Sequence, residues 1–549
     1  MAWPHRGIAH RPAVTGVNGV VASAHPLASL AGLRMLQQGG NAVDAAVATA
    51  AALNVVEPYM SGAGGVGYMV IRSGAPSGHG DDRPVVLDYI GRAPAAATPD
   101  QFPDEETKNT GIRSPLVPGA LGGWLMALER FGALDRTTVF APAISYARDG
   151  FAVTIKNHDF MRNSRDKLRA WATSSAAYLH DGETPKPGSI LKQPDLARTF
   201  EIVVEGGAEP FYRGPIAKEI ARFSQENGGL LTEDDLGTYS PEWQVPITTN
   251  YRGYDVYCPP LPCSGMQYLQ TLNIVEGFDM GAMGQNSADY IHHLAEAIKL
   301  AVADRTTYAP ITTSPVELLI SKEYAADRRG LLDPQKAAFS GGDRYTSSKE
   351  QEEIRPGSIA SIMKESTTHF ATADAAGNVV SCTQTLGGGF GSGVVHGSTG
   401  LALNNFANWF DLDPESPNLI APHKKVEMCL APSQIWRDGE FAMTVGTPGS
   451  FGIMQTTPQM IMNLIDHGYS IQAAIEAPRF KALRGTLLPV ESRMDPEVLA
   501  ALERRGHEVD VLEAWTPFFG GGQGILRDPE SGAFFGGADP RRDGYALAL

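Results

Sequence analysis

Apolar residues recur at helical spacing through much of the first half of the chain. The clearest helices are predicted at Pro26–Gln38, Asn41–Leu53 and Tyr290–Arg305. Asn41 is well placed as an N-cap, and Asp44 lies in the first turn, where the helix dipole favours a negative charge. Residues 115–245 are also mostly of helical composition, with a helix start at Leu230–Leu236.

A glycine run, Ser61–Gly67, joins the second of these helices to the apolar segment Tyr68–Ile71, which we expect to form a strand. A phosphate-binding loop would need a strand before the run and a Lys-Ser or Lys-Thr pair after it. The sequence offers neither feature. The run is therefore interpreted as a tight loop.

The pattern changes after a polar stretch, residues 335–360, which we interpret as a flexible linker because it cannot bury enough apolar area to offset its ordering entropy. His369–Asp374 and Val379–Thr385 then form a predicted hairpin around Ala375-Ala-Gly-Asn378. Further strands are expected at Tyr254–Cys258, Leu401–Leu403, Phe441–Val445 and Glu508–Leu512, and further helices at Met454–Asp466 and Pro496–Arg505. Early helices and late strands favour an α+β fold, a layered sandwich assembled from both halves of the chain.

Composition narrows the classes of function. Hydrophobic residues make up 43% and charged residues 19% of the 549 positions, as in globular proteins. The formal net charge of −16 argues against a nucleic-acid or anionic-membrane partner. The most apolar stretch, residues 42–56, is too short and too polar to span a bilayer. Because no apolar run follows Met1–Arg11, we expect no signal peptide and predict a cytoplasmic protein.

Cysteine and histidine positions do not predict a metal site. Four cysteines in a chain of this length do not make a disulfide framework. The spacing of Cys258 and Cys263 fits neither a zinc pair nor a redox motif, so free thiols are favoured. His292 and His293 adjoin on a predicted helix and so face different directions. We therefore expect no metal and no cofactor.

The candidate chemistry lies where the linker ends, at Ser366, and Thr367-Thr-His369 opens a strand. Alone, this triplet is weak, because threonine is common in strands. Its surroundings, however, resemble the small subunit of γ-glutamyltranspeptidases in Gly377-Asn378, Thr383-Gln-Thr385, Phe390-Gly-Ser-Gly393, Leu403-Asn-Asn405, Gly446-Thr-Pro-Gly-Ser450, Glu476-Ala-Pro-Arg-Phe480 and Gly537-Ala-Asp-Pro-Arg541. The earlier part resembles the large subunit in Gly40-Asn-Ala-Val-Asp-Ala-Ala-Val47, Val56-Glu-Pro58, the Ser61–Gly67 run, Val117-Pro-Gly119, Asp235-Leu236 with Tyr239, Glu296-Ala-Ile-Lys-Leu-Ala301 and Ala303-Asp-Arg305.

The resemblance implies an N-terminal nucleophile hydrolase fold, a four-layered αββα sandwich that cleaves itself before its nucleophile. The cut would fall between Ser366 and Thr367, giving a heterodimer of a large chain, 1–366, and a small chain, 367–549. A threonine hydroxyl needs a base, and the freed α-amino group of Thr367, with a reference pKa of about 7.7–8.0, can serve as one. The resemblance also implies that Thr385 hydrogen-bonds to the nucleophile and that the backbone N–H groups of Gly449 and Ser450 stabilise the oxyanion.

The sequence departs from the family at the residues that recognise the charged end of a γ-glutamyl group. The family's arginine that binds the carboxylate of the glutamyl group aligns with Ile90 of this sequence. An arginine appears two residues later, as Arg92. The remaining recognition positions align with less polar residues, namely Gly387, Phe406, Trp409, Met428 and Cys429. A charged glutamyl end placed against such residues would lose its hydration without gaining partners.

We therefore expect a self-processing amide hydrolase or acyltransferase that acts through an acyl-enzyme on a small amide, with water or an amine as acceptor. Its acyl group is expected not to be γ-glutamyl, as in the acylase-like branch of the family. A genuine γ-glutamyl hydrolase and transpeptidase, in which Arg92 and Asp411 replace the aligned residues, is the alternative. An unprocessed, non-enzymatic relative is the third hypothesis.

Overall fold

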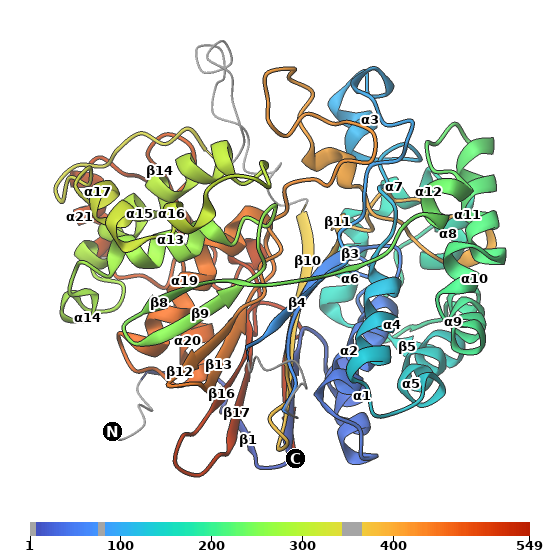
Figure 1. The fold of residues 1–549 in the computed structure, drawn as a ribbon, viewed down its shortest axis with the longest axis horizontal. Coiled ribbons are helices and arrows are strands. Elements are labelled where there is room, and N and C mark those ends of the chain that lie inside the picture. Colours follow the sequence, from blue (N-terminus) through green and yellow to red (C-terminus); the bar gives the residue numbers. More distant parts are fainter. Residues whose placement is uncertain (1–6, 75–82, 343–364) are drawn as a thin grey trace.

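Two seven-stranded antiparallel sheets face each other at the centre of the computed structural model, which describes residues 7–74, 83–342 and 365–549 (Figure 1). The first sheet has, in order, the strands β18 (Tyr545–Ala548), β2 (Gly19–Ser23), β10 (Glu365–Asp374), β11 (Val379–Gly388), β3 (Val66–Arg72), β4 (Val85–Asp88) and β7 (Glu242–Gln244). The second has β1 (Val14–Gly16), β17 (Phe534–Ala538), β16 (Gln523–Arg527), β13 (Glu440–Gly446), β12 (Gln434–Arg437), β9 (Tyr254–Cys258) and β8 (Ile247–Tyr251). Each sheet thus combines strands from both sides of residue 367.

Helices cover the outer face of each sheet. The helix layer of the first sheet comprises α1 (Pro26–Gln37), α2 (Ala42–Val56), α4 (Ala120–Phe131), α5 (Arg136–Asp149) and α9 (Pro194–Gly206). The layer of the second sheet comprises α13 (Met266–Val275), α15 (Ala288–Tyr308), α19 (Ile453–Ile465) and α20 (Ile471–Glu476). A smaller cluster of mainly Val, Ala and aromatic residues fills the space between the sheets. The expected α+β fold with four αββα layers is confirmed.

Shorter elements surround these layers. The other described α-helices are α3 (Glu105–Asn109), α6 (Ile155–Asn163), α7 (Arg165–Arg169), α8 (Ala172–Tyr178), α10 (Glu209–Tyr212), α11 (Pro215–Glu226), α12 (Glu233–Gly237), α14 (Met280–Met283), α16 (Val316–Leu319), α17 (Lys322–Arg329) and α21 (Pro496–Arg504). Two small sheets pair β5 (Phe151–Ala152) with β6 (Ile190–Leu191) and β14 (Leu487–Glu491) with β15 (Glu508–Leu512).

Helix α2 positions Glu57, the residue at its C-terminal end, next to the first sheet. Asn41 caps the helix as predicted, and Asp44 completes a reciprocal pair with it, because each side chain accepts the other residue's backbone N–H. Asp44 also accepts the N–H groups of Ala133 and Leu134, which fixes the start of the helix against the α4–α5 connection. The alanine-rich helix packs closely on β10 and β11 and ends at Val56. Glu57 follows Val56 directly, so the packing of the helix places Glu57 against β10.

Most of the elements expected from the sequence are present, with two corrections. Leu401–Leu403 does not form a strand: Ala402 makes a single bridge to Val395, and Gly400 before it is left-handed, with φ +69°. The strand predicted to open at Thr367 already begins at Glu365, so β10 runs through the expected cleavage site.

Only the first part of the predicted linker is described. Residues 335–342 are tied to the later half of the chain, because Ser340 pairs with Gly485 and Ala337 donates its N–H to the carbonyl of Arg505. The rest of that stretch, residues 343–360, lies outside the described residues.

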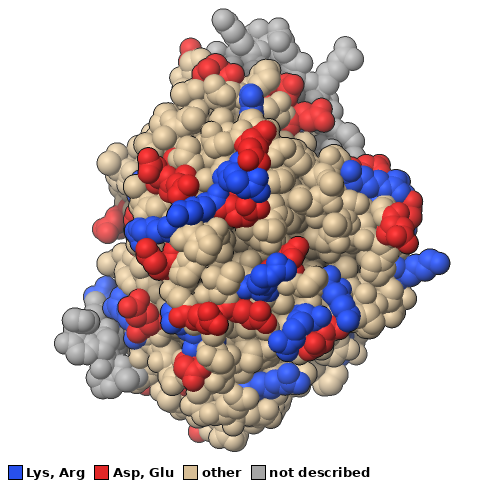
Figure 2. Space-filling model, turned by 90° about the vertical axis from the view of Figure 1, so that its right-hand side faces the viewer, with Lys and Arg blue, Asp and Glu red and all other residues tan. Residues whose placement is uncertain are grey.

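The surface carries charges of both signs. On the face shown in Figure 2, acidic and basic side chains are interspersed and form no broad basic area. That arrangement agrees with the net charge of −16 and offers no electrostatic footprint for a nucleic acid on this face. None of the described helices is both long and apolar enough to cross a bilayer.

Candidate active site

Thr367 lies within β10 at an irregularity of the sheet. Ser366 is paired with Gly387 of β11 and Thr368 with Gln384, so two residues of β11 oppose Thr367. Bulges of this kind re-aim a side chain and are frequent beside active sites. Thr367 is buried, with 3% of its surface exposed. The nucleophile predicted from the sequence therefore lies buried in β10, between β2 and β11.

The Thr385 hydroxyl contacts the bond expected to be cut. It donates a hydrogen bond to the carbonyl oxygen of Ser366 and accepts the N–H of Gly387 at 2.7 Å. The N–H of Gly387 thus occupies a lone pair of the hydroxyl oxygen and leaves its proton for the carbonyl. Attack by the Thr367 hydroxyl on the Ser366 carbonyl would develop negative charge on the same oxygen. The structure brings Ser366, Thr367, Thr385 and Gly387 together.

Gly387 has a backbone role at this point. Its φ is +101°, and a Cβ atom there would lie 2.1 Å from the Asn405 Oδ1 atom. That oxygen accepts the N–H of Gly388 at 2.8 Å, which holds the end of β11 in its bend. A side chain at residue 387 would therefore disturb the donor that orients Thr385.

Gly449 and Ser450 form a tight turn between β13 and α19. Gly449 has φ +130° and Ser450 φ +58°, so both residues of the turn have a positive φ. The short 3₁₀ helix that begins at Ser450 lies against β10 and leads into the N-terminus of α19. Backbone donors at such a terminus suit a developing negative charge. The oxyanion role of the two N–H groups stays a prediction.

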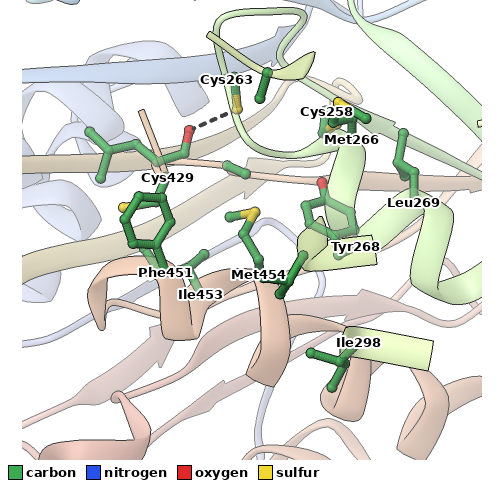
Figure 3. Close-up of a cluster of buried hydrophobic side chains, with 14 of the residues drawn as sticks. Cys258, Cys263, Met266, Tyr268, Leu269, Ile298, Cys429, Phe451, Ile453 and Met454 are labelled. Atoms are coloured by element: carbon green, nitrogen blue, oxygen red, sulfur yellow. Dashed lines mark hydrogen bonds between the residues drawn. The ribbon is translucent and has the colours of Figure 1, made fainter. Parts of the chain in front are cut away.

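The residues predicted to face the acyl group share one hydrophobic cluster. Ile90, Phe406, Trp409, Met428 and Cys429 all belong to it and are buried. The ring of Trp409 lies 5.0 Å from that of Phe451, the residue after Ser450. Figure 3 shows part of this cluster, with Cys429, Phe451 and Met454 among its labelled side chains. The apolar cluster therefore reaches the turn that holds the oxyanion donors.

A sequence model of the family described as Gamma-glutamyltranspeptidase matches residues 28–549. The chain belongs to the γ-glutamyltranspeptidase family. It is 38% identical to an Acylase ACY 1 proenzyme from Pseudomonas sp. strain V22, over 97% of this chain and 94% of that protein. It is 36% identical to the Glutathione hydrolase proenzyme of Escherichia coli K12, over 96% of this chain and 91% of that protein.

The fold agrees with the solved structure of a cephalosporin acylase from Bacillus halodurans. The TM-score is 0.88 at 34% identity, and the match covers 100% of this chain and 98% of that one. These relatives are hydrolases and acylases, so this member of the γ-glutamyltranspeptidase family is an enzyme of the same hydrolase or transferase type.

The two charged residues of the γ-glutamyl alternative have other partners in this family member. Arg92 is 45% exposed and pairs with the Glu242 carboxylate at 2.9 Å. Asp411 accepts a hydrogen bond from the Ser416 hydroxyl, and its backbone pairs with Leu419. Neither side chain would be available to a glutamyl group without giving up these contacts.

Glu57 and Arg542 are functional candidates that the sequence reasoning missed. The Arg542 guanidinium donates to the carbonyl oxygen of Thr367 at 2.7 Å, and the Thr368 hydroxyl donates to the Glu57 carboxylate at 3.1 Å. Burial raises the pKa of Glu57 to about 7, although Arg542 and Thr368 both oppose the rise. Both residues lie in or beside motifs shared with the family, but nothing in the sequence indicates that they meet Thr367.

Other titratable groups have structural partners. His369 contacts the Thr383 hydroxyl at 2.9 Å, and burial lowers its pKa to about 3, so it is neutral and is no base near neutral pH. The four cysteines are buried free thiols.

One group of possible metal ligands lies among the described residues, formed by His292, Glu296 and His507. Glu296 binds the Lys299 ammonium at 2.8 Å, and the two imidazoles contact each other at 2.9 Å. Burial, Lys299 and Arg505 lower the pKa of His507 to about 3, an environment that disfavours a further cation. We assign this group a structural role.

Proposed function

We propose that this chain cleaves itself between Ser366 and Thr367. The contact of the Thr385 hydroxyl with the Ser366 carbonyl supports this proposal most directly. Attack of the Thr367 hydroxyl on the carbonyl carbon would break the peptide C–N bond and leave Ser366 as an ester on Thr367. Water would then hydrolyse the ester, giving a carboxylate on Ser366 and a free α-amino group on Thr367. The products are the large and small chains of a heterodimer.

The freed amino group would then serve the same hydroxyl as a base. Its reference pKa of about 7.7–8.0 leaves a useful neutral fraction near neutral pH. The Thr367 oxygen would attack the amide carbonyl of a small substrate, with the N–H groups of Gly449 and Ser450 as oxyanion donors. The amine leaving group departs with a proton, and the acyl-enzyme passes its acyl group to water or to another amine.

We propose that the acyl group is predominantly apolar. Ile90, Phe406, Trp409, Met428 and Cys429 stand where glutamyl-recognising residues are expected, and they belong to one hydrophobic cluster. A charged glutamyl end against these side chains would cost several kcal/mol. The 38% identity to an acylase supports this choice. The 36% identity to a glutathione hydrolase keeps γ-glutamyl turnover as the second candidate.

The buried free thiols are compatible with a reducing compartment, and we retain the cytoplasm as a proposal. Fractionation of the native source, with the two chains detected separately, would test this location.

Purified wild-type protein is expected to migrate as two chains on a denaturing gel. N-terminal sequencing of the smaller chain should begin at Thr367, and the intact masses should sum to the full chain plus one water. A single full-length chain would refute both enzymatic hypotheses and favour an unprocessed relative. A cut at another residue would refute the assignment of Thr367.

Substrate preference separates the apolar acyl group from a glutamyl group. Hydrophobic acyl anilides are expected to be hydrolysed at least about tenfold better, in kcat/KM, than the γ-glutamyl anilide, because one lost charge contact costs more than 1.4 kcal/mol. An Arg92→Ala variant is the matched control and should leave this ratio unchanged. Preference for the γ-glutamyl anilide, lost in Arg92→Ala, would establish the alternative.

A further inference from the structure

Glu57 is a buried carboxyl group that the proposed chemistry does not yet use. Only 2% of its surface is exposed, at the point where α2 ends beneath β10. Its Oε2 atom accepts the hydroxyl of Thr368, the residue after the nucleophile. A buried carboxylate is costly unless it is paired, so its presence beside the nucleophile calls for a reason.

Arg542 is the cation that compensates Glu57. The two side chains attract each other electrostatically, and Arg542 is also buried, with 4% of its surface exposed. Its guanidinium donates to the Thr367 carbonyl oxygen at 2.7 Å. Arg542 therefore binds the carbonyl oxygen of Thr367, while Glu57 binds the side-chain hydroxyl of Thr368. The two contacts fix neighbouring groups of the Thr367–Thr368 segment.

The other charged and titratable groups around Glu57 come from two places in the chain. Asp543, beside Arg542, raises the pKa of Glu57 and accepts a hydrogen bond from the Thr154 hydroxyl at 2.5 Å. Tyr59, in the turn after α2, has its pKa raised by burial and by Glu57, so it stays neutral. Arg542 is thus the cation that acts on Glu57, and the freed amino group of Thr367 would become a second one.

We infer that Glu57 is a positioning residue whose carboxylate, through Arg542 and Thr368, fixes the Thr367–Thr368 peptide and sets the charge felt by the freed α-amino group. The inference rests on the proposed function, since it requires the cleaved chain. Nitrogen and carbonyl oxygen of Thr367 belong to one residue, so the Arg542 guanidinium lies close to the amine. Without Glu57, that guanidinium would keep only the weaker attraction of Asp539, and its less compensated charge would disfavour the ammonium form.

The test is the pH dependence of kcat in Glu57→Gln, which keeps the shape of the side chain and removes its charge. We expect kcat on the plateau to fall about ten- to a hundredfold, because the nucleophile is less well held. The acid limb, to which the α-amino group and the Glu57 carboxyl both contribute in the wild type, should report the α-amino group alone in this variant and move to lower pH by about half a unit or more. A purely structural defect would lower the plateau and leave the limb in place.

Two further variants make the result specific. Glu296→Gln changes another buried carboxyl, on α15, and should leave the acid limb at its wild-type position. Arg542→Gln removes the cation instead and should move the limb to higher pH, which tests the inference even where Glu57→Gln does not fold. Glu57→Gln could also fold but remain uncleaved while Glu296→Gln is cleaved normally. That outcome would mean that Glu57 already positions Thr367 during self-cleavage, and it would support the inference.

Failure of this inference is distinct from failure of the proposed function. Wild-type protein that is not cut before Thr367 refutes the proposed function itself. Cleaved and active wild-type protein whose acid limb is the same in Glu57→Gln and Arg542→Gln refutes only the role of Glu57.

Discussion

Thr367→Ala is expected to remain one uncleaved chain and to lose at least about a thousandfold in amide turnover. The substitution removes the only atom that both proposed reactions use as nucleophile, the hydroxyl oxygen. The precursor cannot then form the ester, and the amino group is never freed. Denaturing gels and intact mass follow the first effect, and anilide hydrolysis follows the second.

Thr367→Ser is the matched control because it retains the hydroxyl. We expect it to be cleaved and active, although more slowly, since serine lacks the second Cβ branch that restricts the threonine rotamer. Normal cleavage of Thr367→Ala would move the nucleophile to another residue. Equal losses in the Ala and Ser variants would point to disturbed packing in β10 rather than to chemistry.

Local sequence signals account for many of the elements but not for how they meet. The cap formed by Asn41 and Asp44 could be predicted because all its groups lie within four residues. The hairpin of β10 and β11 could likewise be predicted from its short turn, Ala375-Ala-Gly-Asn378. Strands such as β17, Phe534–Ala538, were not predicted because glycine has low strand propensity and their pairing is set by distant partners.

In the candidate active site, too, local motifs could be predicted and long-range contacts could not. The motif around Thr367 predicts a nucleophile there, which stays a prediction, and the structure places the expected neighbour Thr385 on the adjacent strand, at the Ser366 carbonyl. Glu57 and Arg542 could not, because the contacts that bring them to β10 span 311 and 175 residues. The start of β10 before the proposed cleavage site was missed for a related reason: Glu365 and Ser366 look like linker but pair with Gly388 and Gly387.

Asp539→Ala is expected to destabilise the protein by about 3–5 kcal/mol at pH 7, because it removes the ion-pair partner of the buried Arg479 and leaves Arg541 with Glu491 alone. The Asp539 carboxylate lies 2.9 Å from Arg479 and 3.1 Å from Arg541, and it accepts the N–H of Gly522 at 2.9 Å. Arg479 and Arg541 are themselves 1% and 0% exposed. The ions therefore form one buried network that joins β17 and α20 to the loop before β16.

The pH at which unfolding should be measured follows from the direction in which the pKa of Asp539 is shifted. Burial alone would raise the pKa of Asp539, but Arg541 and Arg479 hold it below its usual value. Its contribution to stability is therefore complete above the unfolded pKa of about 3.9 and is lost as the pH falls through the lower folded value. Urea unfolding at pH 7 of the wild type and of Asp539→Ala should show the full difference.

Glu209→Ala is the matched control for removing an acidic partner of an arginine. Glu209 pairs with Arg213 at 3.3 Å, but the two side chains are 67% and 56% exposed. Solvent screens such pairs, so this variant should unfold at nearly the wild-type urea concentration. Equal effects of the two substitutions would mean that the Asp539 network is solvated in solution. A large loss confined to Asp539→Ala would show that burial, rather than the ion pair itself, makes this carboxylate indispensable to the fold that carries Thr367.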